Sequence, residues 1–239
     1  FFGNIYARFR MRQIEKVAAK LDKFIVLTKS DKKDWEPFVP NVTSIYNPLT
    51  FKSEEVAALD NKKCIAIGRL ESQKNFRDLV AAWKYVAEEY PDWVLEIYGN
   101  GSLKESLQKQ ITSLGLDLQV RLMGSSSDIR SKMLDSSCLV MSSAYEGFPM
   151  VLLEAVETGL PMVSYDCPKG PAEIIIDGKS GYLVKPGDVE GLARRVCDVI
   201  SDAGRRKEFG AMAKKTAAQY SIDRIMEQWK TLFEGLMAK

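Results

Sequence analysis

Glu146 and Glu154 flank a Gly-Phe-Pro turn and an apolar run in the stretch SSAYEGFPMVLLEAVETG. Pro149 fits the first position of a helix, and Gly147 and Phe148 form the approach to it. The backbone N–H groups that open such a helix have no acceptor within it and carry the positive end of its dipole. A diphosphate suits this position. The groups concerned belong to Met150, Val151 and Leu152.

The two glutamates fit the other parts of a nucleotide sugar. Glu154 follows Met150 by one helical turn, which places it about 6 Å further along the axis. A ribose can lie there and donate both hydroxyls to the carboxylate. Glu146 precedes the turn, on the side of the phosphates where a sugar would be attached. Considered alone, Glu146 has a simpler explanation as a carboxylate stabilised by the helix dipole, and Glu154 has one as a solvent-facing helix residue. The spacing of the two around the turn favours a nucleotide-sugar site instead.

Two cations follow an earlier predicted strand in IGRLESQKN. Arg69 comes directly after the strand and Lys74 opens the next helix. An arginine can fork two phosphate oxygens and a lysine can act as a point charge, so the pair suits a leaving diphosphate. Surface cations are the alternative. The chain has no D-x-D pair, so we expect no metal and no cofactor beyond the donor itself.

Two further loops are weaker candidates. The stretch LMGSSSD offers backbone groups at Gly124, beside the predicted cleft, where a base can be read. The stretch CPKGPAEII places Lys169 in the loop after another strand, near the position expected for the sugar. The glycines of YGNGSLK lack the third glycine of a dinucleotide fingerprint, and we interpret them as a tight turn.

Alternating strands and helices must position these loops. Such alternation predicts an α/β fold, a Rossmann-like parallel sheet with helices on both faces, and ligands at the carboxyl ends of its strands. We expect strands over 23–28, 42–48, 62–68, 93–99, 119–124, 138–143, 161–166 and 181–184. We expect helices over 4–21, 75–90, 103–114, 128–134, 149–158, 188–202, 204–219 and 221–237.

Composition narrows the class of protein. The 239 residues are 46% hydrophobic and 28% charged, with a net charge of +2, which is ordinary for a soluble globular protein and gives no indication of nucleic-acid binding. The absence of histidine removes histidine-dependent mechanisms unless a further segment supplies one. The four cysteines are widely spaced, which predicts buried reduced thiols and a cytoplasmic protein.

The first 33 residues carry nine lysines and arginines against three acids. Their apolar spacing over 4–21 indicates a basic amphipathic helix, so contact with the inner face of a membrane is one interpretation and a solvated or covered helix is the other. The sequence opens on Phe1 rather than methionine, and we expect it to be a piece of a longer protein.

The stretches IGRLESQKNFRDLV, EIYGNGSLKESL, SSAYEGFPMVLLEAVETGLPMV and GPAEIIIDGKSGYLVKPGD resemble the carboxy-terminal half of GT-B retaining glycosyltransferases of family 4 (glycosyl transferases group 1). The resemblance implies that Arg69 and Lys74 contact the diphosphate and Glu154 the ribose. It implies that Glu146 contacts the donor sugar, together with the backbone of residues 147–149. The E-x7-E pair formed by Glu146 and Glu154 is the hallmark of this group.

The resemblance also implies how the chain is organised. Residues 1–46 correspond to a remnant of an amino-terminal acceptor domain, 47–61 to a linker, 62–220 to the domain that binds the nucleotide sugar, and 221–239 to a helix that crosses back. We therefore expect most of the acceptor domain to lie outside this sequence, and we expect this piece to be inactive or weak by itself. The implied activity is transfer of a hexosyl unit from a nucleotide sugar, which we expect to be a UDP-sugar, to a glycan or lipid-linked acceptor in surface polysaccharide biosynthesis. A GT-B-fold UDP-sugar epimerase and a non-catalytic sugar-nucleotide-binding module are the alternatives.

Overall fold

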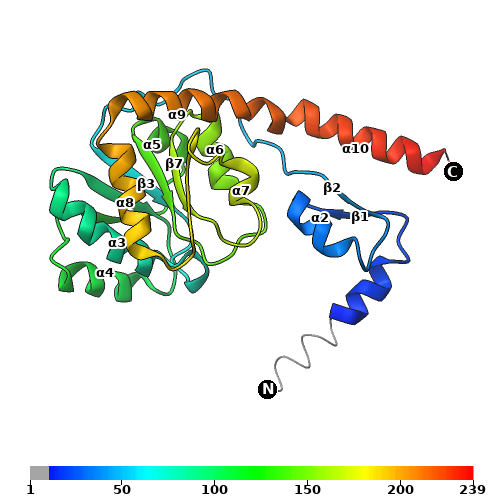
Figure 1. The fold of residues 1–239 in the computed structure, drawn as a ribbon, viewed down its shortest axis with the longest axis horizontal. Helices are drawn as coiled ribbons and strands as arrows, with labels where there is room; N and C mark the ends of the chain where they lie inside the picture. Colours follow the sequence, from blue (N-terminus) through cyan, green and yellow to red (C-terminus); the bar gives the residue numbers. More distant parts are fainter. Residues whose placement is uncertain (1–10, 239) are drawn as a thin grey trace. The chain divides into compact units, whose positions relative to one another are not determined.

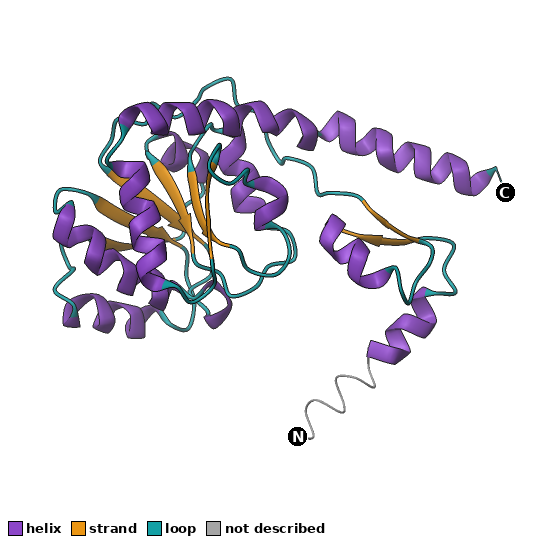
Figure 2. Ribbon diagram, in the orientation of Figure 1, coloured by secondary structure: helices purple, strands orange, loops and turns teal. Residues whose placement is uncertain are grey.

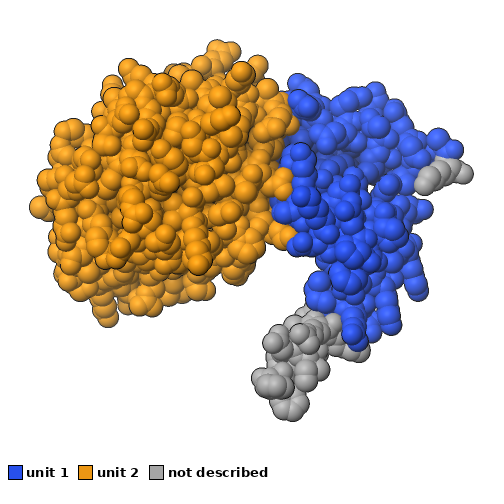
Figure 3. Space-filling model, viewed as in Figure 1, with its two compact units in different colours: residues 1–48, 221–239 blue, residues 49–220 orange. Residues whose placement is uncertain are grey.

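The computed structural model describes residues 11–238, which divide into two compact units. The larger unit is residues 49–220, and the smaller unit combines residues up to Pro48 with those from Ser221 onward (Figure 3). Part of the segment expected as a linker lies in the larger unit. There the N–H of Leu49 donates to the Tyr220 carbonyl and that of Ala57 to the Thr158 carbonyl.

A six-stranded parallel sheet forms the centre of the larger unit (Figure 1). Its strand order is β5-β4-β3-β6-β7-β8, so the order reverses between β3 and β6. This is the doubly wound arrangement, in which ligands bind beyond the carboxyl ends of the strands at the reversal. The strands are β3 (Lys63–Ile67), β4 (Val94–Tyr98), β5 (Val120–Gly124), β6 (Cys138–Met141), β7 (Met162–Tyr165) and β8 (Gly181–Val184).

Helices cover both faces of this sheet (Figure 2), as expected for strands buried on both sides. On one face α8 packs beside α3, and elsewhere α6 packs against α9. The helices of the larger unit are α3 (Phe76–Glu89), α4 (Lys104–Ser113), α5 (Ile129–Leu134), α6 (Met150–Glu157), α7 (Pro171–Ile174), α8 (Val189–Ile200) and α9 (Ala203–Thr216), with 3-10 turns η1 (Ser72–Lys74) and η2 (Ala217–Tyr220).

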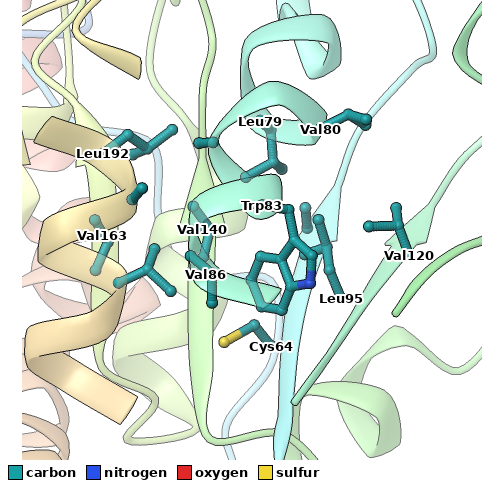
Figure 4. Close-up of a cluster of buried hydrophobic side chains, with 14 of the residues drawn as sticks. Cys64, Leu79, Val80, Trp83, Val86, Leu95, Val120, Val140, Val163 and Leu192 are labelled. Atoms are coloured by element: carbon teal, nitrogen blue, oxygen red, sulfur yellow. The ribbon is translucent and has the colours of Figure 1, made fainter. Parts of the chain in front are cut away.

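The core of the larger unit surrounds Trp83 of α3, which is fully buried. Figure 4 shows its indole among side chains of the sheet, including Cys64 and Leu95. Cys64 pairs in register with Cys138 on the neighbouring strand, and both thiols are buried and unoxidised. Burial raises the pKa of the Cys64 thiol well above its ordinary value, so it stays protonated and acts as a small apolar side chain.

The smaller unit holds β1 (Phe24–Val26), paired in parallel with β2 (Val42–Ser44), and helices α2 (Lys29–Trp35) and α10 (Ile222–Met237). Ala18, Val26, Val39 and Val42 form its buried cluster. Residues 11–18 are helical, while residues 4–10 of the expected amphipathic helix lie outside the described residues. Of the described helices, none has both the length and the apolar content needed to cross a membrane.

The expected strands and longer helices are present, with ends that differ by a few residues. Two helices were missed. The residues of α2 include no buried side chain and hence no apolar stripe, and the Thr28 hydroxyl begins the helix by accepting from the Asp31 N–H. Helix α7 is only four residues long, and its start depends on Gly170 with φ 109° followed by Pro171. Neither produces a hydrophobic period.

We predict that Trp83→Ala lowers the free energy of unfolding by about 3–5 kcal/mol, because it leaves a cavity in a core that is closed on every side. Tyr85 lies on the same helix with 47% of its surface exposed. Tyr85→Ala is therefore the matched control and should cost less than about 1 kcal/mol. Urea denaturation followed by circular dichroism measures both. Equal losses in the two variants would contradict this account of the core.

Candidate functional site

The loops that follow β3 and β6 meet at the point where the strand order reverses. Gly68 follows β3, and a Cβ there would stand 3.0 Å from three side-chain carbons of Lys74. The absence of a side chain at Gly68 therefore leaves room for the lysine stem. A Cβ at Gly99, after β4, would lie 1.8 Å from the Gly68 carbonyl oxygen. The predicted tight turn thus brings the loops after β3 and β4 into direct backbone contact.

Lys74 and Glu146 form an ion pair across this reversal. The lysine Nζ lies 2.6 Å from Oε1 of the glutamate, and the two side chains are 17% and 7% exposed. A charge-assisted hydrogen bond of this length, largely removed from water, is of the strong class. The structure therefore brings together the cation assigned to the diphosphate and the carboxylate assigned to the sugar.

Three further hydrogen bonds fix the same two loops to each other. The Ser142 hydroxyl donates to the Lys74 carbonyl (3.0 Å), and the Ala144 N–H donates to the Gln73 carbonyl (2.8 Å). The Gln73 side chain donates to the Tyr145 carbonyl (3.0 Å) and accepts from Nη2 of Arg69 (3.4 Å). Arg69 is exposed, and its guanidinium is thereby linked to the loop that carries Glu146.

Helix α6 begins one residue later than expected. Pro149 stands before the helix with ψ 93°, which is extended backbone, and no side chain caps the helix start. The Leu152 N–H was wrongly counted as available, because it donates to the Pro149 carbonyl (3.0 Å). Among the described residues no acceptor contacts the N–H of Met150 or Val151. These two amides are therefore the backbone donors at the start of α6 that are free to bind an anion, as the sequence predicts.

The approach to α6 is open on one side and packed on the other. A Cβ at Gly147 would meet nothing within 4 Å, so a ligand can come close to the backbone there. The Phe148 side chain is buried, with its ring 6.1 Å from that of Tyr220. Pro149 is buried as well. Only the backbone of these two residues can therefore contact a ligand.

Glu154 lies on α6, one turn beyond its start, and is half-buried. Within residues 11–238 its carboxylate has no hydrogen-bond or salt-bridge partner. Burial raises the pKa of this carboxyl above its ordinary value. A part-buried acid without a partner is costly to the folded chain, and such costs are typical of groups that await a ligand.

The loop after β7 supports the loop of Glu146. The Glu146 N–H donates to the Pro168 carbonyl (3.3 Å), and a Cβ at Gly170 would lie 2.2 Å from Cδ of Pro149. Lys169 sits between them, half-buried and with φ 69°. The structure therefore places Lys169 in a strained segment beside the start of α6.

A hollow of about 390 Å³ opens beyond β3, β4 and β5. It is lined by residues that include Gly68, Arg69, Gly99, Asn100 and Ser125. Gly124 has φ 73° and its carbonyl accepts from the Gly99 N–H, so this glycine shapes the wall of the hollow rather than lining it.

Sequence reasoning missed Gln73 and Asn100. The Asn100 side chain donates to the Ser125 hydroxyl (2.7 Å) at the mouth of the hollow. In the sequence both residues are ordinary polar loop positions. Only the strand order shows that Gln73 links the loops after β3 and β6 and that Asn100 links the loops after β4 and β5. The described residues contain no group of three or more acids and cysteines placed to hold a metal ion.

We predict that Glu154→Gln raises the melting temperature of the unliganded chain at neutral pH. Since folding raises the pKa of this carboxyl, the folded chain binds the proton more tightly than the unfolded chain. This tighter proton binding contributes fully to the free energy of unfolding below the ordinary glutamate pKa of about 4.3. The contribution is lost as the pH rises through the raised pKa of the folded chain. The amide avoids that loss, so the difference between variant and wild type should vanish in acid.

Thermal denaturation across this pH range checks the expectation. Glu208 lies on α9 and is exposed, so Glu208→Gln removes one charge without changing a buried group. The control should show no comparable pH-dependent gain. A variant at position 154 that melts below the wild type at neutral pH would show that the carboxylate has a stabilising partner.

The family model of glycosyl transferases group 1 matches residues 50–216. The amylovoran biosynthesis glycosyltransferase AmsD of Erwinia amylovora is 33% identical over 220 residues, which cover 88% of this chain and 62% of that protein. An uncharacterized glycosyltransferase of Haemophilus influenzae is 30% identical over 212 residues, covering 87% of this chain and 60% of that protein. The chain thus spans about three-fifths of the length of these two relatives.

Solved structures agree with this assignment. A crystal structure of the S. aureus protein TarM with fondaparinux, alpha-GlcNAc-glycerol and UDP has 27% sequence identity and a TM-score of 0.85. The match covers 93% of this chain and 46% of that one. The expected α/β architecture is confirmed, and the neighbouring structures are GT-B glycosyltransferases. Together with the family model, these matches show that the chain belongs to the glycosyl transferases group 1 family and resembles the carboxy-terminal half of its GT-B members.

Proposed function

We propose that the intact protein transfers a hexosyl unit from a UDP-sugar to a glycan or lipid-linked acceptor with retention, and that this chain binds the donor. The observation that carries the proposal is the position of the Lys74–Glu146 pair beside a helix start whose first two amides have no acceptor among the described residues. A cation, two amides and the Glu154 carboxylate, which has no partner within residues 11–238, match the phosphates and ribose of one nucleotide.

The residues act by positioning and electrostatics. The acceptor hydroxyl attacks the anomeric carbon while the bond from that carbon to the diphosphate oxygen breaks. Arg69, Lys74 and the α6 amides stabilise the charge that develops on the leaving diphosphate. Attack from the leaving-group side retains the configuration, and an oxygen of the departing phosphate takes the hydroxyl proton. Glu146 orients the sugar and is not the nucleophile. No metal takes part, since cations and amides neutralise the phosphates.

The relatives support a role in polysaccharide synthesis. The name of the Erwinia protein refers to amylovoran biosynthesis, and the TarM structure contains UDP. The Erwinia protein is named as a glycosyltransferase, which favours a transferase over an epimerase or a binding module. We place the base in the hollow of about 390 Å³, next to Gly124, and Lys169 near the sugar. A further acceptor-binding domain would complete the enzyme, which acts in the cytoplasm.

We predict that the 239-residue chain binds UDP more tightly than 2′-deoxy-UDP, by roughly ten- to hundredfold, because a hydrogen bond from the 2′-hydroxyl to the Glu154 carboxylate is lost. Glu154→Ala should bind the two nucleotides equally. Calorimetric titration measures all four affinities, and GDP and ADP test the choice of base. If the variant kept the wild-type preference for the ribonucleotide, Glu154 would not be the ribose ligand.

The smaller unit supports a second proposal, that residues 11–21 contact the inner face of an anionic membrane. Met11, Ile14, Val17 and Leu21 are exposed there, beside Arg12, Lys16 and Lys20. The chain is expected to sediment with vesicles that contain phosphatidylglycerol and not with phosphatidylcholine vesicles. Binding that survives removal of residues 1–22 would contradict this anchor.

A further inference from the structure

Glu146 holds Lys74 in the unliganded chain. The two side chains are only 7% and 17% exposed, so each charge depends on the other for compensation. A diphosphate bound at Lys74 needs the same positive charge that the Glu146 carboxylate already uses. The two anions are therefore in competition for one lysine.

We propose that Glu146 is an internal competitor of the diphosphate for Lys74, and that this competition makes the site hold the intact donor in preference to the nucleoside diphosphate product. The inference rests on the proposed function. In the intact donor, the sugar hydroxyls supply Glu146 with replacement hydrogen bonds, so the pair can open without leaving a buried carboxylate unsatisfied.

Transfer removes that compensation. Once the sugar has moved to the acceptor, Glu146 no longer has the hydroxyls as partners, and a carboxylate 7% exposed is poorly solvated. When the Glu146 carboxylate pairs with Lys74 again, the interaction of the lysine with the diphosphate becomes weaker. Glu146 thus acts both as the sugar ligand and as a positioning residue for Lys74.

The surroundings allow this exchange without movement of the backbone. The Lys74 carbonyl accepts from Ser142, and the stem of the lysine passes over Gly68, so the root of the side chain is fixed. The space beside Gly147 is open, with nothing within 4 Å of a Cβ placed there. A sugar can therefore reach the Glu146 loop while the lysine stays in place.

The test is calorimetric titration of the 239-residue chain with UDP, and with UDP-glucose, UDP-galactose and UDP-N-acetylglucosamine. Glu146→Gln should bind UDP roughly tenfold more tightly than the wild type, because the lysine has lost its competing anion. The same variant should bind no UDP-sugar more tightly, so the preference for donor over product falls. Glu208→Gln controls for net charge and should change neither affinity.

Two more variants separate this role from simple support of the fold. Glu146→Asp keeps the charge with a shorter reach, so it should tighten UDP binding by a smaller factor, and it serves if the amide variant does not fold. In a Lys74→Met background, Glu146→Gln should no longer tighten UDP binding. A purely structural role for Glu146 would lower the melting temperature while leaving the shift produced by saturating UDP unchanged.

The outcomes distinguish the two proposals. If the wild type binds UDP and Glu146→Gln binds it equally or more weakly, the competition is excluded and the proposed function stands. If the wild type binds neither UDP, GDP nor ADP, the proposed function fails and the competition fails with it.

Discussion

A lysine and a glutamate separated by 72 positions in the sequence meet at 2.6 Å, and the candidate site is built around that contact. The contact exists because β3 and β6 are neighbours in the sheet while their loops leave in opposite directions. Each loop is short and is hydrogen-bonded to the other through its backbone. Because the pair is largely removed from water, moving either charge away from the other is costly, so both side chains are held in defined positions. Recognition of a charged ligand requires such fixed positions.

The sequence was sufficient for much of this arrangement. Strands such as Cys138–Met141 are short, continuous apolar runs between turn residues, and the helices between them have clear periodicity. Glu154 could be placed on the wall of α6 because a regular helix fixes the distance from its start. The Gly-Phe-Pro turn before α6 could also be recognised, because it depends only on residues that are neighbours in the sequence.

What could not be predicted depends on the order of the strands. That Glu146 lies against Lys74 follows from the pairing of β3 with β6, which is a contact between distant segments. The bridging role of Gln73 is of the same kind, and a lone glutamine in a loop carries no signal of it. The Leu152 amide donates to the Pro149 carbonyl, and no residue pattern specifies this contact in the first turn of α6.

The division into two units has a consequence for engineering. Every side chain of the candidate site lies between Leu49 and Tyr220, in a unit with its own core. The chain enters this unit at Leu49 and leaves it at Tyr220, and the Leu49 N–H donates to the Tyr220 carbonyl at 2.8 Å. Entry and exit are thus adjacent. Residues 49–220 can therefore be exchanged as one piece between related proteins, because the two junctions, at Leu49 and Tyr220, lie next to each other.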